Sequence, residues 1–140
     1  MAYLFDTDAI SELLRPQPLM AYLEWLRDVP REGQFTSAVV VGELYRGAYR
    51  SPARERHLAK IRQRVLPAVT VLPYDVAVAE VCGSLSAQLE EAGQSLADAD
   101  LQIAATAVYH NLELVSGNLR HFLRIPQLRC NPILAKSRRL

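Results

Sequence analysis

Short apolar runs alternate along the chain with longer segments in which apolar residues recur at helical spacing. The spacing predicts strands over 3–5, 34–36, 68–72 and 112–116, with a possible edge strand over 128–130. It predicts a first helix that ends near residue 15, followed by helices over about 19–28, 38–50, 53–66, 76–92 and 99–110. A short helical turn is predicted at 119–123. This alternation predicts an α/β fold: a central, mostly parallel sheet of four to five short strands, flanked by helices on both faces.

Several residues fit the predicted ends of these elements. Ser37 and Asp75 each precede an apolar helical run and suit the N-cap position, and Gly93 suits the position just after a helix. The apolar run at 68–72 is continuous rather than alternating, which is typical of a buried parallel strand. With no internal repeat, linker or low-complexity segment, we expect one domain over residues 1–140.

Composition narrows the class of protein. Of 140 residues, 50% are hydrophobic and 22% charged, as in ordinary globular domains. No apolar run approaches the ~18 residues of a membrane span, and the N-terminus lacks the basic start of a signal peptide. Cys82 and Cys130 show no metal-binding or disulfide spacing. We therefore expect a cytoplasmic protein without a membrane partner.

Charge is sorted into blocks although the formal net charge is only +1. Segments 1–45 and 75–113 are rich in acidic residues. In segments 46–64 and 114–140 the charged residues are mostly arginine, and Glu55 is the single acid. Such sorting suits an acidic pocket rimmed by basic surface that acts on a polyanion. The alternative is that the basic helices are simply solvated faces.

Acidic and polar residues stand where several predicted elements begin or end. Asp6 ends the first strand, Glu43 lies two turns into the helix after the second, and Asp100 lies in the first turn of a later helix. Ser116 and Asn118 follow another strand. Because the carboxyl ends of parallel strands share one edge of a sheet, we expect these side chains to meet in one crevice.

Each acid also has a structural interpretation. Asp6 and Asp8 could be helix caps, and Asp98 fits a cap better than a ligand position. Glu43 lies in an apolar helix, so it belongs either at the exposed edge of that helix or in a polar pocket. Asp100 is harder to explain as a cap because it is already inside the helix.

If Asp6, Glu43 and Asp100 converge, they repel one another. Two such charges ~4 Å apart interact by roughly 4 kcal/mol at an intermediate dielectric, and a divalent cation would offset that repulsion. Oxygen ligands without His or Cys favour Mg²⁺ or Mn²⁺ over zinc. Such ions bind phosphate oxygens and activate water, so phosphodiester hydrolysis is the expected chemistry.

Four sequence blocks carry a family resemblance. YLFDTDAISELLR, SAVVVGELYRGAYR, DADLQIAATAVYHNLELVSGNLRHF and the following RIP resemble the blocks of PIN-domain nucleases, and more narrowly those of VapC toxins from type II toxin–antitoxin pairs. The resemblance runs from Tyr3 to about Arg129. It implies a PIN-like fold in which Asp6, Glu43 and Asp100 are the catalytic, metal-binding acids. Asn118 stands where many relatives carry a fourth acid, so we expect one firmly bound metal, with Asn118 and Ser116 in supporting roles.

The resemblance also implies partners. A VapC-type toxin is an endoribonuclease that commonly dimerises and is neutralised by a VapB-type antitoxin. The C-terminal segment of the antitoxin lies over the active-site groove, and the complex binds operator DNA through the antitoxin. Leu13, Leu14, Tyr45 and Tyr49 are candidates to line that groove, although core positions are their simpler interpretation.

Two other functions compete with this one. The chain could be a PIN-like module that binds RNA or protein without cleaving, a hypothesis supported by Asn118 and by the arginine-rich segments. Alternatively, Asp6-x-Asp8 after a strand could belong to a phosphotransfer site, but such sites need a lysine after a later strand, and neither Lys60 nor Lys136 fits. No GxSxG motif is present, and His57, His110 and His121 show no obvious catalytic partner.

Overall fold

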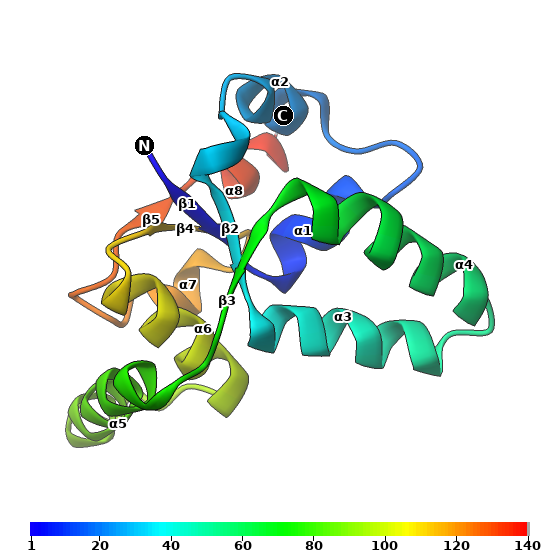
Figure 1. Cartoon of the computed structure of the whole chain (residues 1–140). Coiled ribbons are helices and arrows are strands. Elements are labelled where there is room, and N and C mark those ends of the chain that lie inside the picture. The colour runs from blue at the N-terminus through cyan, green and yellow to red at the C-terminus, as the bar shows by residue number, and fades with distance from the viewer. Residues whose placement is uncertain (140) are drawn as a thin grey trace.

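Five short parallel strands form one sheet in the computed structural model, which describes residues 1–139 (Figure 1). The strands are β1 (Tyr3–Phe5), β2 (Gln34–Ser37), β3 (Thr70–Leu72), β4 (Glu113–Val115) and β5 (Cys130–Asn131). Their order across the sheet is β3-β2-β1-β4-β5, and every neighbouring pair is parallel. The predicted α/β architecture is confirmed, with the sheet parallel throughout.

Helices connect the strands and pack around the sheet (Figure 1). The α-helices are α1 (Thr7–Leu13), α2 (Met20–Arg27), α3 (Ala38–Arg50), α4 (Arg54–Lys60), α5 (Val76–Glu91), α6 (Asp98–Tyr109), α7 (Leu119–Phe122) and α8 (Ile133–Ser137). A π turn, η2 (Ile61–Val65), and a 3₁₀ turn, η3 (Leu66–Ala68), continue α4, so the predicted helix over 53–66 is real but irregular; another 3₁₀ turn, η1 (Arg31–Gly33), precedes β2. None of the described helices combines the length and apolar character needed to cross a membrane.

Helix caps confirm two predicted boundaries and correct a third. The side chain of Ser37 accepts a hydrogen bond from the Val40 amide at 3.1 Å, and that of Asp75 accepts from the Val78 amide at 3.0 Å. The prediction that Asp98 caps α6 is wrong, because Asp98 is itself the first helical residue and Ala97 occupies the N-cap without a side-chain bond. The carboxylate of Asp98 still lies in the first turn, where it offsets the helix dipole.

Strand β1 runs through the centre of the core. The ring of Trp25 on α2 packs against Tyr3 and Phe5, with ring centroids 5.0 Å and 6.3 Å away. Because side chains alternate along a strand, Leu4 points to the opposite face of the sheet, where it is completely buried. Both faces of β1 are therefore covered, as the sequence pattern predicts.

Strand β3 departs from the prediction of a buried strand. It pairs with β2 and lies at an edge of the sheet, which leaves Val71 38% exposed. A continuous apolar run does not distinguish a central strand from an edge strand, since neighbours supplied by distant segments decide which it becomes.

The strand order reverses at β1, which has β2 on one side and β4 on the other. Phe5 is in register with Val115, so the residues that follow β1 and β4 leave the sheet side by side. A switch point of this kind opens a crevice at the carboxyl ends of the strands. In this protein Asp6 and Ser116 stand at that crevice.

Candidate active site

Asp6 is fixed at the switch point by its backbone and its side chain. Its amide donates to the Val115 carbonyl at 3.2 Å, and its Oδ1 accepts from the Ala9 amide at 2.8 Å as the N-cap of α1. The side chain is buried, with 5% of the residue exposed. Asp6 is therefore both a helix cap and a wall of the crevice, so the two interpretations of this residue hold together.

A cavity of about 300 Å³ opens at this point and brings the predicted acids together. Its lining comprises Asp6, Thr7, Asp8, Glu43, Asp100, Ile103, Asn118 and Phe122. Ser116 is fully buried behind it, where its hydroxyl accepts from the Asn118 amide at 2.9 Å. Asp98 is exposed and is not one of the described lining residues, which supports the preference for Asp100.

Burial and nearby negative charge raise the pKa values of two carboxylates of this cavity, Asp6 and Asp100. Burial raises the pKa of Asp6 to about 7, with smaller contributions from the charges of Asp8 and Asp100, against hydrogen bonds from Ser116 and Ala9 that lower it. Burial, followed by the charge of Glu43, raises the pKa of Asp100, while His121 lowers it. The cavity thus concentrates negative charge that an added cation would stabilise.

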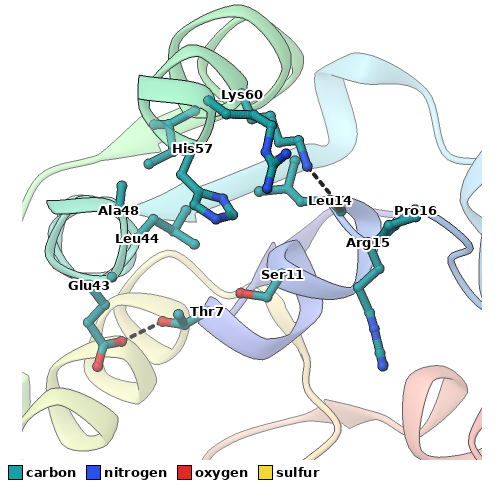
Figure 2. A pocket seen from close by; sticks show the side chains of 13 residues that line it. Thr7, Ser11, Leu14, Arg15, Pro16, Glu43, Leu44, Ala48, His57 and Lys60 are labelled. Carbon is teal, nitrogen blue, oxygen red and sulfur yellow. Dashed lines mark hydrogen bonds between the residues drawn. The ribbon is translucent and has the colours of Figure 1, made fainter. Parts of the chain in front are cut away.

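Glu43 reaches the cavity from the exposed edge of α3. Its Oε1 accepts a hydrogen bond from the hydroxyl of Thr7 (Figure 2). Thr7 follows Asp6 directly, so α1 and α3 are joined at the site itself. Of the two positions predicted for Glu43, the exposed helix edge is correct, and it borders the polar cavity.

The chemistry of these side chains suits a hard divalent cation. Asp6, Glu43 and Asp100 offer only carboxylate oxygens and Asn118 an amide, the ligands typical of Mg²⁺ and Mn²⁺. Among residues 1–139, however, no three His, Cys, Asp or Glu side chains stand close enough to hold a metal ion as they lie. The three acids line one cavity, and their coordination of a metal ion stays a prediction.

Two neighbours of the cavity were missed from the sequence. His121, for which the sequence shows no obvious catalytic partner, has Nδ1 2.9 Å from Asn118 Nδ2 and 3.8 Å from Asp100 Oδ2. Its position three residues after Asn118 in a short helical turn was an available signal. Arg138 forms an ion pair with Asp8, a contact between the two ends of the chain that no sequence pattern indicates.

A second cavity of about 680 Å³ adjoins the first between α1, α3 and α4 (Figure 2). Thr7 and Glu43 line both cavities, so this groove leads into the acidic site. Its walls include Leu14, Leu44, Ala48 and Ile61, and its basic side chains are Arg15, Arg56, His57 and Lys60. Of the four predicted groove residues, only Leu14 lines it; Leu13 and Tyr45 pack partly buried against the core, and Tyr49 is 50% exposed.

Comparison with known proteins gives consistent matches over nearly the whole chain. The family model described as PIN domain matches residues 3–128. Ribonuclease VapC2 of Haemophilus influenzae is 33% identical over 129 residues, covering 92% of this chain and 96% of that protein. The crystal structure of FitAcB from Neisseria gonorrhoeae superposes with a TM-score of 0.85 at 31% identity, covering 93% of this chain and 97% of that one. VapBC2 from Rickettsia felis, bound to a DNA fragment from its promoter, superposes with a TM-score of 0.85 at 26% identity, covering 94% and 98%.

Proposed function

Because this chain belongs to the PIN domain family and is of the VapC type, we propose that it is a Mg²⁺- or Mn²⁺-dependent endoribonuclease that acts as the toxin of a toxin–antitoxin pair. The observation that carries the proposal is the cavity at the β1/β4 switch point, where Asp6, Glu43, Asp100 and Asn118 meet. The name of the H. influenzae relative, a ribonuclease, supports RNA as the substrate.

We propose that Asp6, Glu43 and Asp100 hold the metal and are the catalytic acids. A divalent ion bound among them would neutralise phosphate charge and lower the pKa of a water molecule for attack on phosphorus. The raised pKa of Asp6 supports this assignment, since a buried carboxylate that resists ionisation gains most from a cation.

Other residues would hold these acids in place. The α1 cap fixes Asp6, and the Thr7 hydroxyl orients Glu43 from the neighbouring helix. Asn118 can orient water or substrate at the open side of the cavity, and Ser116 supports it from behind. The arginine-rich segment 46–64, which follows Glu43 in the chain, supplies guanidinium groups for the RNA backbone.

We propose that the groove beside the cavity takes the C-terminal segment of a VapB-type antitoxin. A segment lying there would run over Leu14 and Ile61 and reach Glu43 at the acidic end, which would block access of RNA to the site. Lys60 donates from Nζ to the Leu14 carbonyl at 3.3 Å (Figure 2). Lys60 and Arg56, which both line this groove, would favour acidic residues on that segment.

The wider assembly follows from the same proposal. VapBC2 of R. felis binds a DNA fragment from its promoter, and we propose that the complex of this chain with its antitoxin likewise binds operator DNA, through the antitoxin. We further propose a single catalytic domain that forms homodimers in the cytoplasm. Light scattering of the purified chain, alone and with its antitoxin, tests the dimer.

RNA cleavage by the purified chain tests the central activity. With Mg²⁺ or Mn²⁺ we expect single cuts that leave a 5′-phosphate and a 3′-hydroxyl; with a chelator, or in Asp6→Ala, we expect cleavage at least ~100-fold slower, in line with removal of an essential acid. Full activity without metal or in Asp6→Ala would refute the proposal. Metal binding and RNA binding without any cleavage would instead indicate the non-cleaving module.

A further inference from the structure

Asp8 is the carboxylate of the acidic cavity that an arginine holds. Arg138 donates from Nη1 to Oδ2 of Asp8 at 2.8 Å and from Nη2 to Oδ1 at 2.7 Å. This is the two-point fork that a guanidinium forms with a carboxylate, and it occupies both oxygens of Asp8. Nη2 of Arg138 also lies 3.5 Å from Oε1 of Glu12.

The surrounding structure is built to accommodate this pair. Glu12 is buried, with 2% of the residue exposed, and it accepts from the Leu19 amide at 3.2 Å, so the second partner of Arg138 is rigidly held. Gly117 lies directly against the pair: a Cβ at this position would collide with Arg138 Nη1 and with Asp8 Oδ2. The loop after β4 therefore needs glycine at 117 for Arg138 to reach Asp8.

We infer that Arg138 limits the cavity to a single divalent cation by withholding Asp8 from metal coordination. The inference rests on the proposed metal site of Asp6, Glu43 and Asp100. Asp8 lines the same cavity and lies close enough to Asp6 for its charge to act on that residue. If both oxygens of Asp8 were free, the cavity would offer a fourth carboxylate. Two-metal sites hold ions about 4 Å apart between such groups.

The contact also makes the last helix part of the site. Arg138 follows α8 directly, so its fork ties the C-terminal end of the chain to the first turn of α1. Arg138 acts through Asp8 and is a positioning residue that sets the charge of the cavity. A purely structural role for the pair would leave the number of bound cations unchanged.

Isothermal titration of Mn²⁺ into chelator-treated protein tests the inference without relying on activity. Wild type should bind about one Mn²⁺ per chain, whereas Arg138→Ala should bind about two, because Asp8 becomes available. The double variant Asp8→Asn/Arg138→Ala should return to one. Arg139→Ala removes the same charge from the next, exposed residue and should bind like wild type. A thermal melt of each variant shows whether it is folded at the temperature of the titration.

The outcomes separate the inference from the proposal beneath it. One Mn²⁺ in both wild type and Arg138→Ala would overturn the role of Arg138 and leave the metal site intact. A second Mn²⁺ that persists in the double variant would also overturn it, because Asp8 would not be the added ligand. No Mn²⁺ binding in any variant would refute the proposed metal site and the inference with it. If Arg138→Ala is unfolded, Arg138→Lys replaces it: a single ammonium leaves one oxygen of Asp8 free, and the second Mn²⁺ should still appear.

Discussion

Asp6 should lower the stability of the metal-free protein at neutral pH. Its pKa is 3.8 in its ordinary state and about 7 in the folded chain, chiefly through burial. Between about pH 4 and pH 7 the unfolded chain releases this proton while the folded chain keeps it, so the free energy of unfolding falls as pH rises. The contribution of Asp6 to the free energy of unfolding is fully present below its ordinary pKa of 3.8 and is lost as pH rises through its folded pKa of about 7.

The magnitude follows from the two pKa values. A pKa difference of one unit corresponds to ~1.4 kcal/mol. The rise in the pKa of Asp6 from 3.8 to about 7 therefore lowers the free energy of unfolding by about 4 kcal/mol at pH 8. Asp6→Asn removes the ionisation, and asparagine caps a helix about as well as aspartate. We therefore expect this variant to be inactive and yet more stable than wild type at pH 8, by up to about 4 kcal/mol, with nearly equal stability at pH 4.

Urea unfolding of both proteins in chelator, at several values between pH 4 and pH 8, measures the difference directly. Subtracting one curve from the other removes the titration of the remaining acids, which the two chains share. A difference that stays constant over this range would refute the argument, since it would mean that Asp6 ionises alike in the folded and unfolded chains. Added Mn²⁺ should restore the stability of wild type at pH 8 and leave Asp6→Asn unchanged.

Three further substitutions test separate parts of the structure. Asn118→Asp adds an acid to the three proposed metal ligands and should tighten Mn²⁺ binding about tenfold, as measured by calorimetry; unchanged affinity would mean that residue 118 does not interact with the ion. Thr36→Val removes the buried hydrogen bond from Oγ1 to the Phe5 carbonyl at 2.7 Å and should lower the free energy of unfolding by about 1–2 kcal/mol in urea, with no loss if water replaces the bond. Gly117→Ala should destabilise the chain by about 1–3 kcal/mol, less so in an Arg138→Ala background, and an equal loss in both backgrounds would contradict the steric argument.

The sequence was sufficient for the parts of the fold governed by local pattern. Ser37 and Asp75 mark real helix starts, because a side chain that caps a helix acts within a few residues of itself. The acids Asp6, Glu43 and Asp100 could be placed at one crevice because parallel strands bring their carboxyl ends to one edge.

Contacts between distant segments set the limit of prediction. The apolar run at 68–72 predicts a buried strand, but β3 lies at the edge of the sheet, because its position depends on which strands flank it and the run does not encode that order. The fork between Arg138 and Asp8 joins the two ends of the chain and leaves no periodic signature. The sequence does not distinguish a cap of α6 from a first-turn residue at Asp98, because both positions share the same acidic preference.

The metal site is most directly tested by a pair of neighbouring acids with opposite expected roles. Asp100 lines the cavity and Asp98 is exposed two residues away, so Asp100→Asn and Asp98→Asn remove the same charge from the same helix. The measurement is the rate of RNA cleavage as a function of Mn²⁺ concentration. We expect Asp98→Asn to match wild type and Asp100→Asn to be slower by at least ~100-fold, with a site that no longer saturates with metal. Equal rates in Asp100→Asn and wild type would contradict the assignment of this cavity as the catalytic centre.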